Sequence, residues 1–320
     1  MFTLENFEAE LAAAIKSLFA NSPMLPMMEY HFALGGKRLR PRMAYLAAAK
    51  LQDKNLQATL SRFAVAVELI HNATLIHDDI QDGDEFRRGK PALWKQFSMP
   101  QAINCGDALF FAAMQWVQSA PCELALKEKL QEWIAKESYA VINGQSQEFF
   151  LKEAFLQTPS SVTKAAYEAM VRGKTSALFV MPYVGGALLA GASEAEIAEV
   201  EALSGELGFA FQIQDDLLDL WGSKGRDRVG TDIAEGKLSY PVVLAWSALS
   251  KEKARLRELI LKPRESTTDS DISWAIAELD KCGAKAQAKQ DCIQLFEKLS
   301  AHSKKFAEIS DSLLLVVRKL

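Results

Sequence analysis

Apolar side chains recur every three or four positions over most of the chain, which is the spacing of one face of an α-helix. The first apolar stripe begins at Leu4 and ends before the loop residues 21–23. A longer stripe runs from Leu56 to Asp82, with neither proline nor glycine before Gly83. We therefore expect a surface helix near the N-terminus and one long helix that ends just before Gly83.

The same spacing predicts helices along the rest of the chain. They are expected at residues 104–116, 124–150, 160–171, 174–189, 194–220 and 240–250, followed by three C-terminal helices. A loop with Gly35 and Gly36 leads into one more helix, whose first turn suits Pro41. No alternating pattern predicts a strand. The polar connection at 263–271 is too short for a domain linker, so we expect a single domain over residues 1–320.

Composition supports an all-α fold. Glycine and proline are scarce, at 17 and 10 of 320 residues, which favours long helices. Hydrophobic residues make up 49% and charged residues 24%, which excludes a disordered or collagen-like chain. The net charge of −4 leaves no overall positive field to recruit nucleic acid or anionic lipid. Any site for an anion must therefore be local.

Cysteine usage and apolar runs bear on the compartment. The four cysteines show neither CxxC spacing nor the density of a disulfide scaffold, so we expect reduced thiols in the cytoplasm. The N-terminal segment carries acidic residues where a signal peptide would be basic. The most apolar run, 177–192, contains Pro182 and is shorter than the roughly 20 residues of a membrane span. We expect a buried helix there and no transmembrane segment.

Two acidic clusters share one spacing, in HDDIQD at 77–82 and QDDLLD at 214–219. Each cluster has carboxylates at positions i, i+1 and i+4, so that two of them project one turn apart on a shared helix face. Both clusters lie at C-terminal ends of expected helices, where the helix dipole is already negative. The six side chains are Asp78, Asp79, Asp82, Asp215, Asp216 and Asp219. A bound divalent cation would relieve the repulsion among them.

Carboxylate oxygens without nearby cysteine favour Mg²⁺ over Zn²⁺, and Mg²⁺ commonly completes its shell with substrate phosphate oxygens. A solvated acidic surface explains one such cluster as well as a metal site does, but it explains two clusters less well. An EF-hand fails the spacing test because Gly89 stands where a bidentate Glu is required. A diphosphate that bridges Mg²⁺ ions therefore fits the pattern best.

Cations occur near both clusters and near the double glycine. They are Arg87 and Arg88 after the first cluster, Lys37 and Arg40 beside Gly36, and Lys237 after the second cluster. Phosphate recognition explains them jointly, although surface salt bridging would explain any one alone. The GGK sequence lacks the upstream glycine and the following Ser or Thr of a P-loop, so nucleotide hydrolysis loses support.

Together these motifs resemble the trans-isoprenyl diphosphate synthases, the family of farnesyl and geranylgeranyl diphosphate synthases. The resemblance covers nearly the whole chain. Its motifs are GGKRLRP (35–41), ELIHNATLIHDDIQDGDEFRRGKP (68–91), NCGDALF (104–110), GQSQEF (144–149), RGKTSALF (172–179), FQIQDDLLDLWG (211–222) and GTDIAEGKLSYP (230–241). It implies the isoprenoid synthase fold, a single helical bundle around a central apolar cavity, and a homodimer.

The resemblance also implies residue roles. The six aspartates would bind three Mg²⁺ ions around an allylic diphosphate, which would also contact Arg87, Lys174, Gln212, Arg228 and Lys237. Isopentenyl diphosphate would bind Gly36, Lys37, Arg40, His71 and Arg88. The Lys174 backbone, Thr175 and Gln212 would stabilise a carbocation. The allylic site takes one cation from the loop that contains Lys224, Arg226 and Arg228, and we choose Arg228 because it stands two positions before Gly230.

The position of His71 relative to the first acidic cluster indicates its role. It stands seven residues before Asp78, two turns along the same helix face, which favours a substrate contact over a buried core histidine. His77, beside the first cluster, is interpreted as a packing residue. Glu148 stands where many relatives have Asp. Arg318-Lys319 resembles a basic tail that closes over the site in some of those relatives.

The reaction implied is an Mg²⁺-dependent head-to-tail (1′-4) condensation of isopentenyl diphosphate with an allylic diphosphate. One alternative is a class I terpene cyclase, but its second metal motif would carry Asn, Ser or Thr and Glu, and it needs no pocket at Lys37 and Arg40. A second alternative is a non-catalytic subunit that regulates a partner synthase. Its acidic motifs would be degraded, whereas both motifs here are intact.

Product length depends on what blocks the cavity below the first acidic motif. Ala73 and Thr74 lie one turn before Asp78 and are small, so that floor is open. Since a helical turn rises about 5.4 Å, close to one isoprene unit, the next blockers are expected at Ile70 and, from the neighbouring helix, at Phe110, Phe111 or Met114. We expect a geranylgeranyl (C20) or somewhat longer product, with farnesyl (C15) still open.

Overall fold

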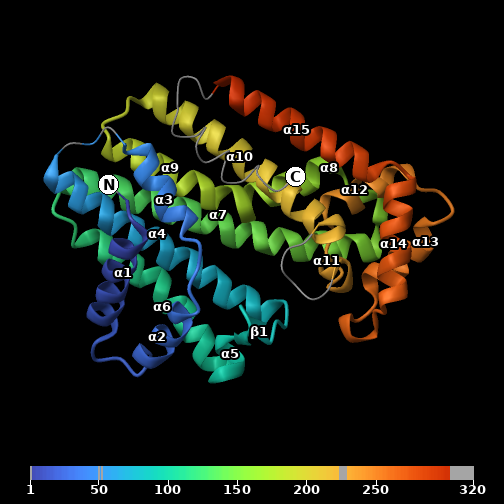
Figure 1. Cartoon of the computed structure of the whole chain (residues 1–320), viewed down its shortest axis with the longest axis horizontal. Coiled ribbons are helices and arrows are strands. Elements are labelled where there is room, and N and C mark those ends of the chain that lie inside the picture. Colours follow the sequence, from blue (N-terminus) through green and yellow to red (C-terminus); the bar gives the residue numbers. More distant parts are fainter. Residues whose placement is uncertain (1, 50, 52, 223–228, 303–320) are drawn as a thin grey trace. The chain divides into compact units, whose positions relative to one another are not determined.

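The computed structural model describes residues 2–49, 51, 53–222 and 229–302, and helices dominate this part of the chain (Figure 1). The helices are α1 (Leu4–Phe19), α2 (Leu25–Ala33), α3 (Leu39–Ala47), α4 (Lys54–Gln81), α5 (Leu93–Gln96), α6 (Met99–Gln118), α7 (Leu124–Gln157), α8 (Lys164–Val171), α9 (Ala177–Leu189), α10 (Glu194–Trp221), α11 (Thr231–Ala234), α12 (Tyr240–Ala248), α13 (Lys253–Leu261), α14 (Asp269–Lys281) and α15 (Ala284–His302). The expectation of an all-α fold is confirmed.

Short elements complete the chain. Two-residue strands β1 (Phe86–Arg87) and β2 (Lys90–Pro91) pair antiparallel, so the expectation of no strand is wrong at this one hairpin. Two 3₁₀ turns are η1 (Pro159–Ser161) and η3 (Arg264–Ser266), and a π-helical turn, η2 (Arg172–Ser176), joins α8 to α9. None of the helices in the described part of the chain is both long and apolar enough to cross a membrane.

The chain divides into two compact units. Unit 1 comprises Met1–Ser138 and Leu178–Glu201, and unit 2 comprises Tyr139–Ala177 and Ala202–Leu320. Each unit contains one of the two acidic clusters. The expectation of a single domain over the whole chain stays a prediction.

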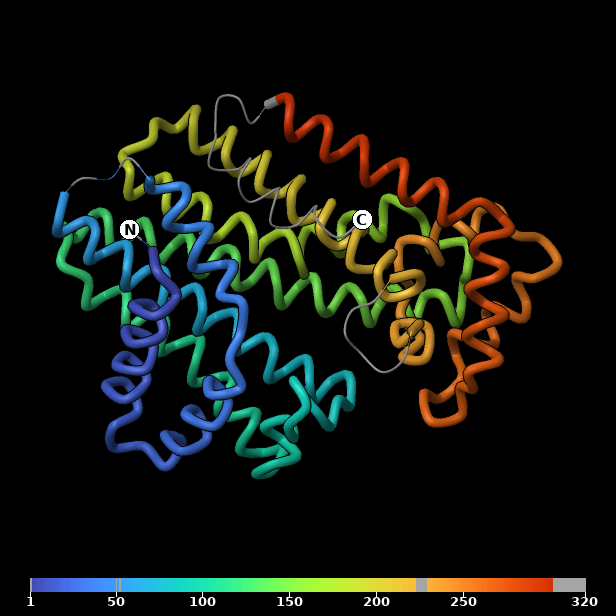
Figure 2. Tube along the Cα trace, viewed as in Figure 1, coloured from blue at the N-terminus to red at the C-terminus, as the bar shows by residue number. Residues whose placement is uncertain are grey.

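Helix α4 is the central element of unit 1. It packs along α6 over much of its length and also contacts α1 and α3 (Figure 2). Its side chains Phe63, Leu69 and Ile70 are fully buried, and Gly185 of α9 lies so close to Phe63 that a Cβ there would overlap the ring. The Asp53 carboxylate caps the N-terminus by accepting from two backbone N–H groups. Helix α4 therefore fixes the position of the aspartates at its C-terminal end.

Helix α10 carries the second cluster in unit 2. Aromatic rings pack beside it, with the centroids of Tyr167 and Tyr240 5.4 Å apart and those of Phe209 and Tyr240 6.1 Å apart. Helix α12 contacts both α8 and α15. From α15, the Cys292 thiol donates to the backbone oxygen of Ala210 at 3.7 Å. The cluster on α10 thus rests on a rigid aromatic and helical support.

Several helix boundaries differ from the sequence expectation for local reasons. Helix α6 begins five residues early because Ser98 caps it and Pro100 fits its first turn. Helix α8 begins four residues late because Thr163, which accepts from the Ala166 N–H, is its cap. Helix α7 continues seven residues past Phe150. Helix α2 was not expected at all.

Candidate active site

The first acidic cluster lies where α4 ends. Asp82 is the C-cap residue, and its N–H donates to the Asp78 carbonyl at 2.8 Å. Gly83 follows in the left-handed region at φ +68°, a conformation that suits glycine and turns the chain away from the helix axis. Asp79 is buried at 1% exposure, whereas Asp78 and Asp82 are half-buried. The helix end thus presents carboxylates with different environments.

The β1–β2 hairpin brings an arginine onto the buried aspartate. Its two-residue turn consists of Arg88 and Gly89, which both have positive φ (54° and 77°), as a type I′ turn requires. Arg87 Nε and Nη2 donate to the two carboxylate oxygens of Asp79 at 2.7 and 2.5 Å. Burial raises the pKa of Asp79, and the Arg87 guanidinium opposes that rise. The bidentate pair holds Arg87 against the acidic helix end.

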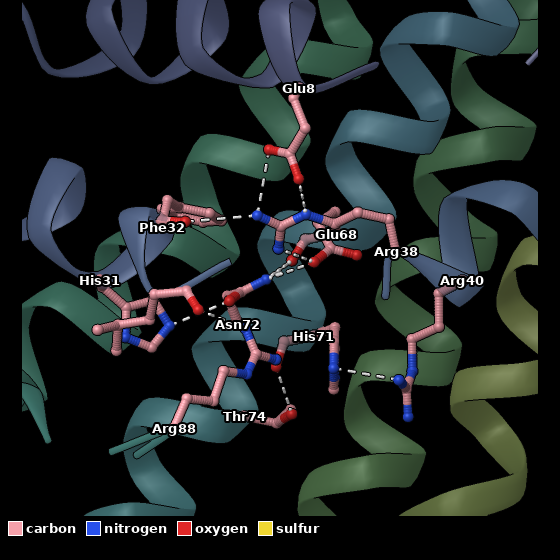
Figure 3. Close-up of polar contacts among 11 residues, drawn as sticks. Glu8, His31, Phe32, Arg38, Arg40, Glu68, His71, Asn72, Thr74 and Arg88 are labelled. Atoms are coloured by element: carbon pink, nitrogen blue, oxygen red, sulfur yellow. Dashed lines mark hydrogen bonds and ion pairs between the residues drawn. The ribbon is translucent and has the colours of Figure 1, made fainter. Parts of the chain in front are cut away.

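A group of cationic side chains lies beside this hairpin and includes residues predicted to bind isopentenyl diphosphate. A Cβ on Gly36 would stand 3.1 and 3.2 Å from the guanidinium nitrogens of Arg88, so the loop backbone lies directly against that cation. Arg40 Nη1 lies 3.1 Å from His71 Nε2 (Figure 3). Lys37 is exposed on the same loop. The structure therefore places Gly36 against Arg88 and Arg40 against His71, and the charges of Arg40 and Arg88 both act on His71.

Burial determines the protonation states of Arg40 and His71. Desolvation lowers the pKa of Arg40 to about 10, so it still carries its charge at neutral pH. Burial, followed by the charge of Arg40 and its neighbours, lowers the pKa of His71 well below its usual value. His71 is therefore neutral, and because Arg40 can only donate, His71 Nε2 must accept and Nδ1 carries the proton.

The second acidic cluster is held from several sides. Asp216, 3% exposed, accepts from the Tyr167 hydroxyl and the Tyr240 N–H, each at 2.6 Å, and from Gln212 Nε2 at 2.8 Å. Burial raises the pKa of Asp216 to about 6, against these three donors. Asp219 accepts from the Thr231 hydroxyl at 2.6 Å. Both carboxylates are thereby fixed in orientation.

Asp219 also accepts from the Asp232 N–H at 3.1 Å, so the segment after the second cluster folds back onto α10. Within that segment, Lys237 pairs with Glu235 at 2.8 Å. Asp215, the neighbour of Asp216, is half-buried. Lys237 and the second cluster both belong to unit 2. The predicted contact of Lys237 with a diphosphate stays a prediction.

The π-helical turn η2 supplies Lys174 and Thr175, two of the three residues predicted to stabilise a carbocation, and α10 supplies the third, Gln212. The Thr175 hydroxyl donates to Gln212 Oε1 at 2.7 Å, which links the turn through Gln212 to the second cluster. Lys174 pairs with Glu148. A Cβ on Gly144 would stand only 2.1 Å from the Lys174 nitrogen, so the backbones of α7 and η2 are in direct contact there. The Glu148 that departs from the family pattern thus has a specific partner.

The product-length residues predicted on α4 are buried in unit 1. Ile70, Ala73 and Thr74 are all almost inaccessible to solvent. On α6, Phe110 approaches the His77 ring with centroids 6.1 Å apart, whereas Phe111 is exposed. Their effect on product length stays a prediction.

Several predicted residues lie outside the described part of the chain. These are Lys224, Arg226 and Arg228 of the loop and Arg318 and Lys319 of the C-terminal tail. Their roles stay predictions.

Sequence reasoning missed the residues that support the site. In unit 2 these are Tyr167, which lies outside every quoted motif, and Thr231, which lies in the motif at 230–241 without an assigned role. In unit 1 they are Glu68 and Asn72 on α4, which lie in the motif at 68–91, also without an assigned role. Both are polar positions in an otherwise apolar helix on the face of His71, so the four-residue spacing between them is a signal that would have found them.

The aspartates suit Mg²⁺ by their chemistry. Among the described residues, no three histidine, cysteine or acidic side chains lie close enough together to hold a metal ion by themselves. Mg²⁺ commonly takes one or two carboxylates and completes its octahedron with water and phosphate oxygens. The carboxylate oxygens of each cluster therefore fit an ion that binds together with a diphosphate.

Comparisons with known proteins agree with this chemistry. The family model described as Polyprenyl synthetase matches residues 22–279. The chain is 34% identical to the geranylgeranyl diphosphate synthase of Mycobacterium tuberculosis, over 85% of this chain and 79% of that protein. It is also 34% identical to the short chain isoprenyl diphosphate synthase of Methanothermobacter thermautotrophicus, over 82% and 78%.

A solved structure supports the fold assignment. The crystal structure of a geranylgeranyl pyrophosphate synthase is similar with a TM-score of 0.87 and 26% identity, and the match covers 100% of both chains. The helical architecture is thus that of the polyprenyl synthases, as the motifs predict.

Proposed function

This chain belongs to the polyprenyl synthetase family, and from that premise we propose that it is a prenyltransferase that condenses isopentenyl diphosphate head-to-tail with an allylic diphosphate. One observation carries the proposal at the level of the site: α4 places His71 of the cationic group two turns before the aspartates at its end. A diphosphate pocket and a metal-binding helix end therefore share one rigid element. The product is a trans-polyprenyl diphosphate of C20 or somewhat longer.

The six aspartates form the proposed Mg²⁺ site, with three ions for each allylic diphosphate. Their surroundings support different roles for the buried and the half-buried aspartates. Asp79 and Asp216 are buried and both of their oxygens accept strong hydrogen bonds, so they orient their clusters. Asp78, Asp82 and Asp215 are half-buried, and their carboxylate oxygens would hold the ions. When bound, Mg²⁺ neutralises the charge that develops on the departing diphosphate.

We propose that each diphosphate substrate binds the positively charged and polar residues that its motifs supply. Isopentenyl diphosphate binds the Gly36 backbone and the side chains of Lys37, Arg40, His71 and Arg88. The allylic diphosphate binds Arg87, Lys174, Gln212, Arg228 and Lys237. Arginine forks and a close backbone approach suit a diphosphate because they match several of its oxygens at once. The neutral state of His71 leaves its Nδ1–H as a donor rather than a charge.

The chemistry needs no protein nucleophile. The allylic C–O bond breaks and its electron pair leaves with the diphosphate. The π electrons of isopentenyl diphosphate then form the new C–C bond, and a proton is lost to the released diphosphate. Oriented oxygens of Thr175, Gln212 and the Lys174 backbone stabilise the cation, and such electrostatic stabilisation is usually the largest catalytic contribution. Apolar helix walls exclude the water that would quench it.

Product analysis tests the proposal. The purified chain is incubated with Mg²⁺, isopentenyl diphosphate and either dimethylallyl, geranyl or farnesyl diphosphate, and products are identified by mass spectrometry. We expect trans-polyprenyl diphosphates of C20 or longer and no product when EDTA is present. A cyclic hydrocarbon from an allylic diphosphate alone would instead identify a cyclase. Inactivity with every primer would favour a regulatory subunit.

We also infer a homodimer in the cytoplasm. The dimer follows from the family resemblance, and the compartment is supported by the four cysteines, all of which are free thiols. Sedimentation equilibrium tests the dimer, with an expected mass of about 71 kDa, twice the chain mass of 35.4 kDa.

A further inference from the structure

A buried arginine lies directly beneath the Gly36 loop and has no role in the substrate contacts proposed above. Arg38 is 3% exposed, and its backbone adopts the left-handed conformation at φ 48°, which is rare for a residue with a side chain. It is the N-cap residue of α3. A non-glycine residue persists in this conformation only when its surroundings hold it there.

Two carboxylates hold Arg38. Its Nε and Nη2 donate to Glu8 at 2.8 and 3.3 Å, and its Nη1 donates to Glu68 at 2.7 Å. Burial alone would lower the pKa of Arg38, but the hydrogen bonds and charges of the two carboxylates outweigh it and raise the pKa. Glu68 comes from α4, whereas Glu8 comes from α1. The guanidinium is therefore clamped between two helices.

The clamp continues into a buried network (Figure 3). Asn72 Nδ2 donates to Glu68 Oε1 at 2.9 Å and to the Glu68 carbonyl at 2.8 Å, and Asn72 Oδ1 lies 3.0 Å from His31 Nε2. Because an amide oxygen only accepts, His31 must carry its proton on Nε2. The hydrogen bonds from Glu8 to His31 Nε2 thus form one chain of defined donors and acceptors, and the network joins α1, α2 and α4.

The network reaches the substrate pocket through Gly36. A Cβ on Gly36 would stand 3.1 Å from Arg38 Nη1 and also 3.1 Å from Arg88 Nη1. The buried guanidinium and the exposed one therefore both lie against the same point of the loop. A shift of Arg38 would change the contacts of Gly36 and Arg88 at this point, and with them the proposed contacts of isopentenyl diphosphate.

We propose that Glu8, acting through Arg38, is a positioning residue for the isopentenyl diphosphate pocket, so that α1 forms part of the substrate site. Glu8 stands outside residues 22–279, the range matched by the family model. The inference rests on the proposed function, because it concerns one of the two substrates of that reaction. Glu8 touches no substrate and acts only by fixing the guanidinium beneath the loop.

Steady-state kinetics of Glu8→Gln test the inference on the full chain. At saturating allylic diphosphate, the KM for isopentenyl diphosphate should rise about tenfold, the equivalent of one charge-assisted hydrogen bond. The KM for the allylic substrate and kcat should stay within about twofold of the wild type. Glu5→Gln is the matched control because it removes an exposed carboxylate from the same helix, and it should leave all three constants unchanged.

A second variant separates positioning from general stability. Arg38→Lys keeps the charge but cannot bridge both carboxylates, so it should raise the same KM. The double variant with Glu8→Gln should add little, because both changes break one contact. An unchanged KM in Glu8→Gln, or equal losses for both substrates with a lower Tm, would overturn the inference. Wild-type protein that forms no product would instead overturn the proposed function.

Discussion

Adjacent aspartates within each acidic cluster have different chemical environments. Asp216 is buried and accepts three hydrogen bonds, whereas Asp215 is half-buried beside it. A buried carboxylate of this kind fixes the geometry of its exposed neighbour. The same division holds for Asp79 and Asp78 at the end of α4.

Removing the buried aspartate of the second cluster should therefore lower activity severely. Asp216→Ala leaves the Tyr167 hydroxyl and Gln212 without their acceptor, and it leaves transition-state charge uncompensated. We expect kcat to fall by about 10³-fold or more. Product formation over time measures this loss, with Asp280→Ala as a surface control that keeps wild-type activity. Near-normal turnover in Asp216→Ala would contradict the role assigned to the second cluster.

His31 makes a prediction about stability and pH. Burial, followed by the charges of Arg87, Arg88 and Arg38, lowers its pKa to about 3, with a smaller opposing contribution from Asn72. Between pH 6.5 and 3, His31 is protonated in the unfolded chain but neutral in the folded chain. The free energy of unfolding therefore falls as the pH falls through this range. From pH 7 to pH 5, the free energy of unfolding falls by about 2 kcal/mol because of His31.

Urea unfolding of wild type and His31→Gln at pH 7 and pH 5 measures that cost. The wild type should lose about 2 kcal/mol more than the variant between the two pH values, because glutamine does not titrate. Equal losses in the two proteins would show that His31 accepts a proton while folded.

At the scale of elements, α4 combines metal ligands, pocket residues and the proposed cavity floor. Its small Ala73 lies one turn before the first acidic cluster and is fully buried. Ala73→Phe should fill the space one turn below that cluster and shorten the main product by about one isoprene unit, since a turn rises about 5.4 Å. Mass spectrometry of the products checks this. Ala58→Phe, at an exposed position of the same helix, should leave product length unchanged.

The long helices were predictable because their patterns are long. Helices α4 and α10 were expected within two residues of their observed bounds, since a sustained apolar stripe runs through each and a glycine follows each C-terminal end. The β1–β2 hairpin escaped because two-residue strands carry no alternation to detect. The π-helical turn η2 escaped for a related reason: its wider hydrogen bonding leaves no periodic trace in five residues.

At the scale of the molecule, each compact unit carries one acidic cluster, and the proposed function assigns both clusters to one diphosphate. A double-mutant cycle tests that assignment. Asp78→Asn and Asp215→Asn should each lower kcat/KM, and the double variant should lose less than the product of the two single losses. Residues that hold the same group are not independent. Strictly multiplicative losses would show that the clusters act separately.

The sequence pointed to residues that we propose carry the chemistry, but it did not show which groups hold them. The aspartates and Arg40 stand in motifs whose spacing leads to a hypothesis about their roles. Supporting groups such as Tyr167 and Glu8 lie far from those motifs along the chain and reach them only after folding. A single sequence contains the first kind of information directly. The second kind depends on tertiary contacts that no local pattern specifies.

The left-handed arginine of the hairpin has a consequence for thermal stability. Arg88 occupies a type I′ turn position for which asparagine followed by glycine is the favoured pair, and a left-handed residue other than glycine costs roughly 1 kcal/mol. Arg88→Asn should therefore raise Tm by about 2 °C while it impairs use of isopentenyl diphosphate. Calorimetry and kinetics on one preparation measure both effects. A rise in Tm together with impaired use of isopentenyl diphosphate would show that this turn gives up thermal stability to place a guanidinium at the proposed substrate site.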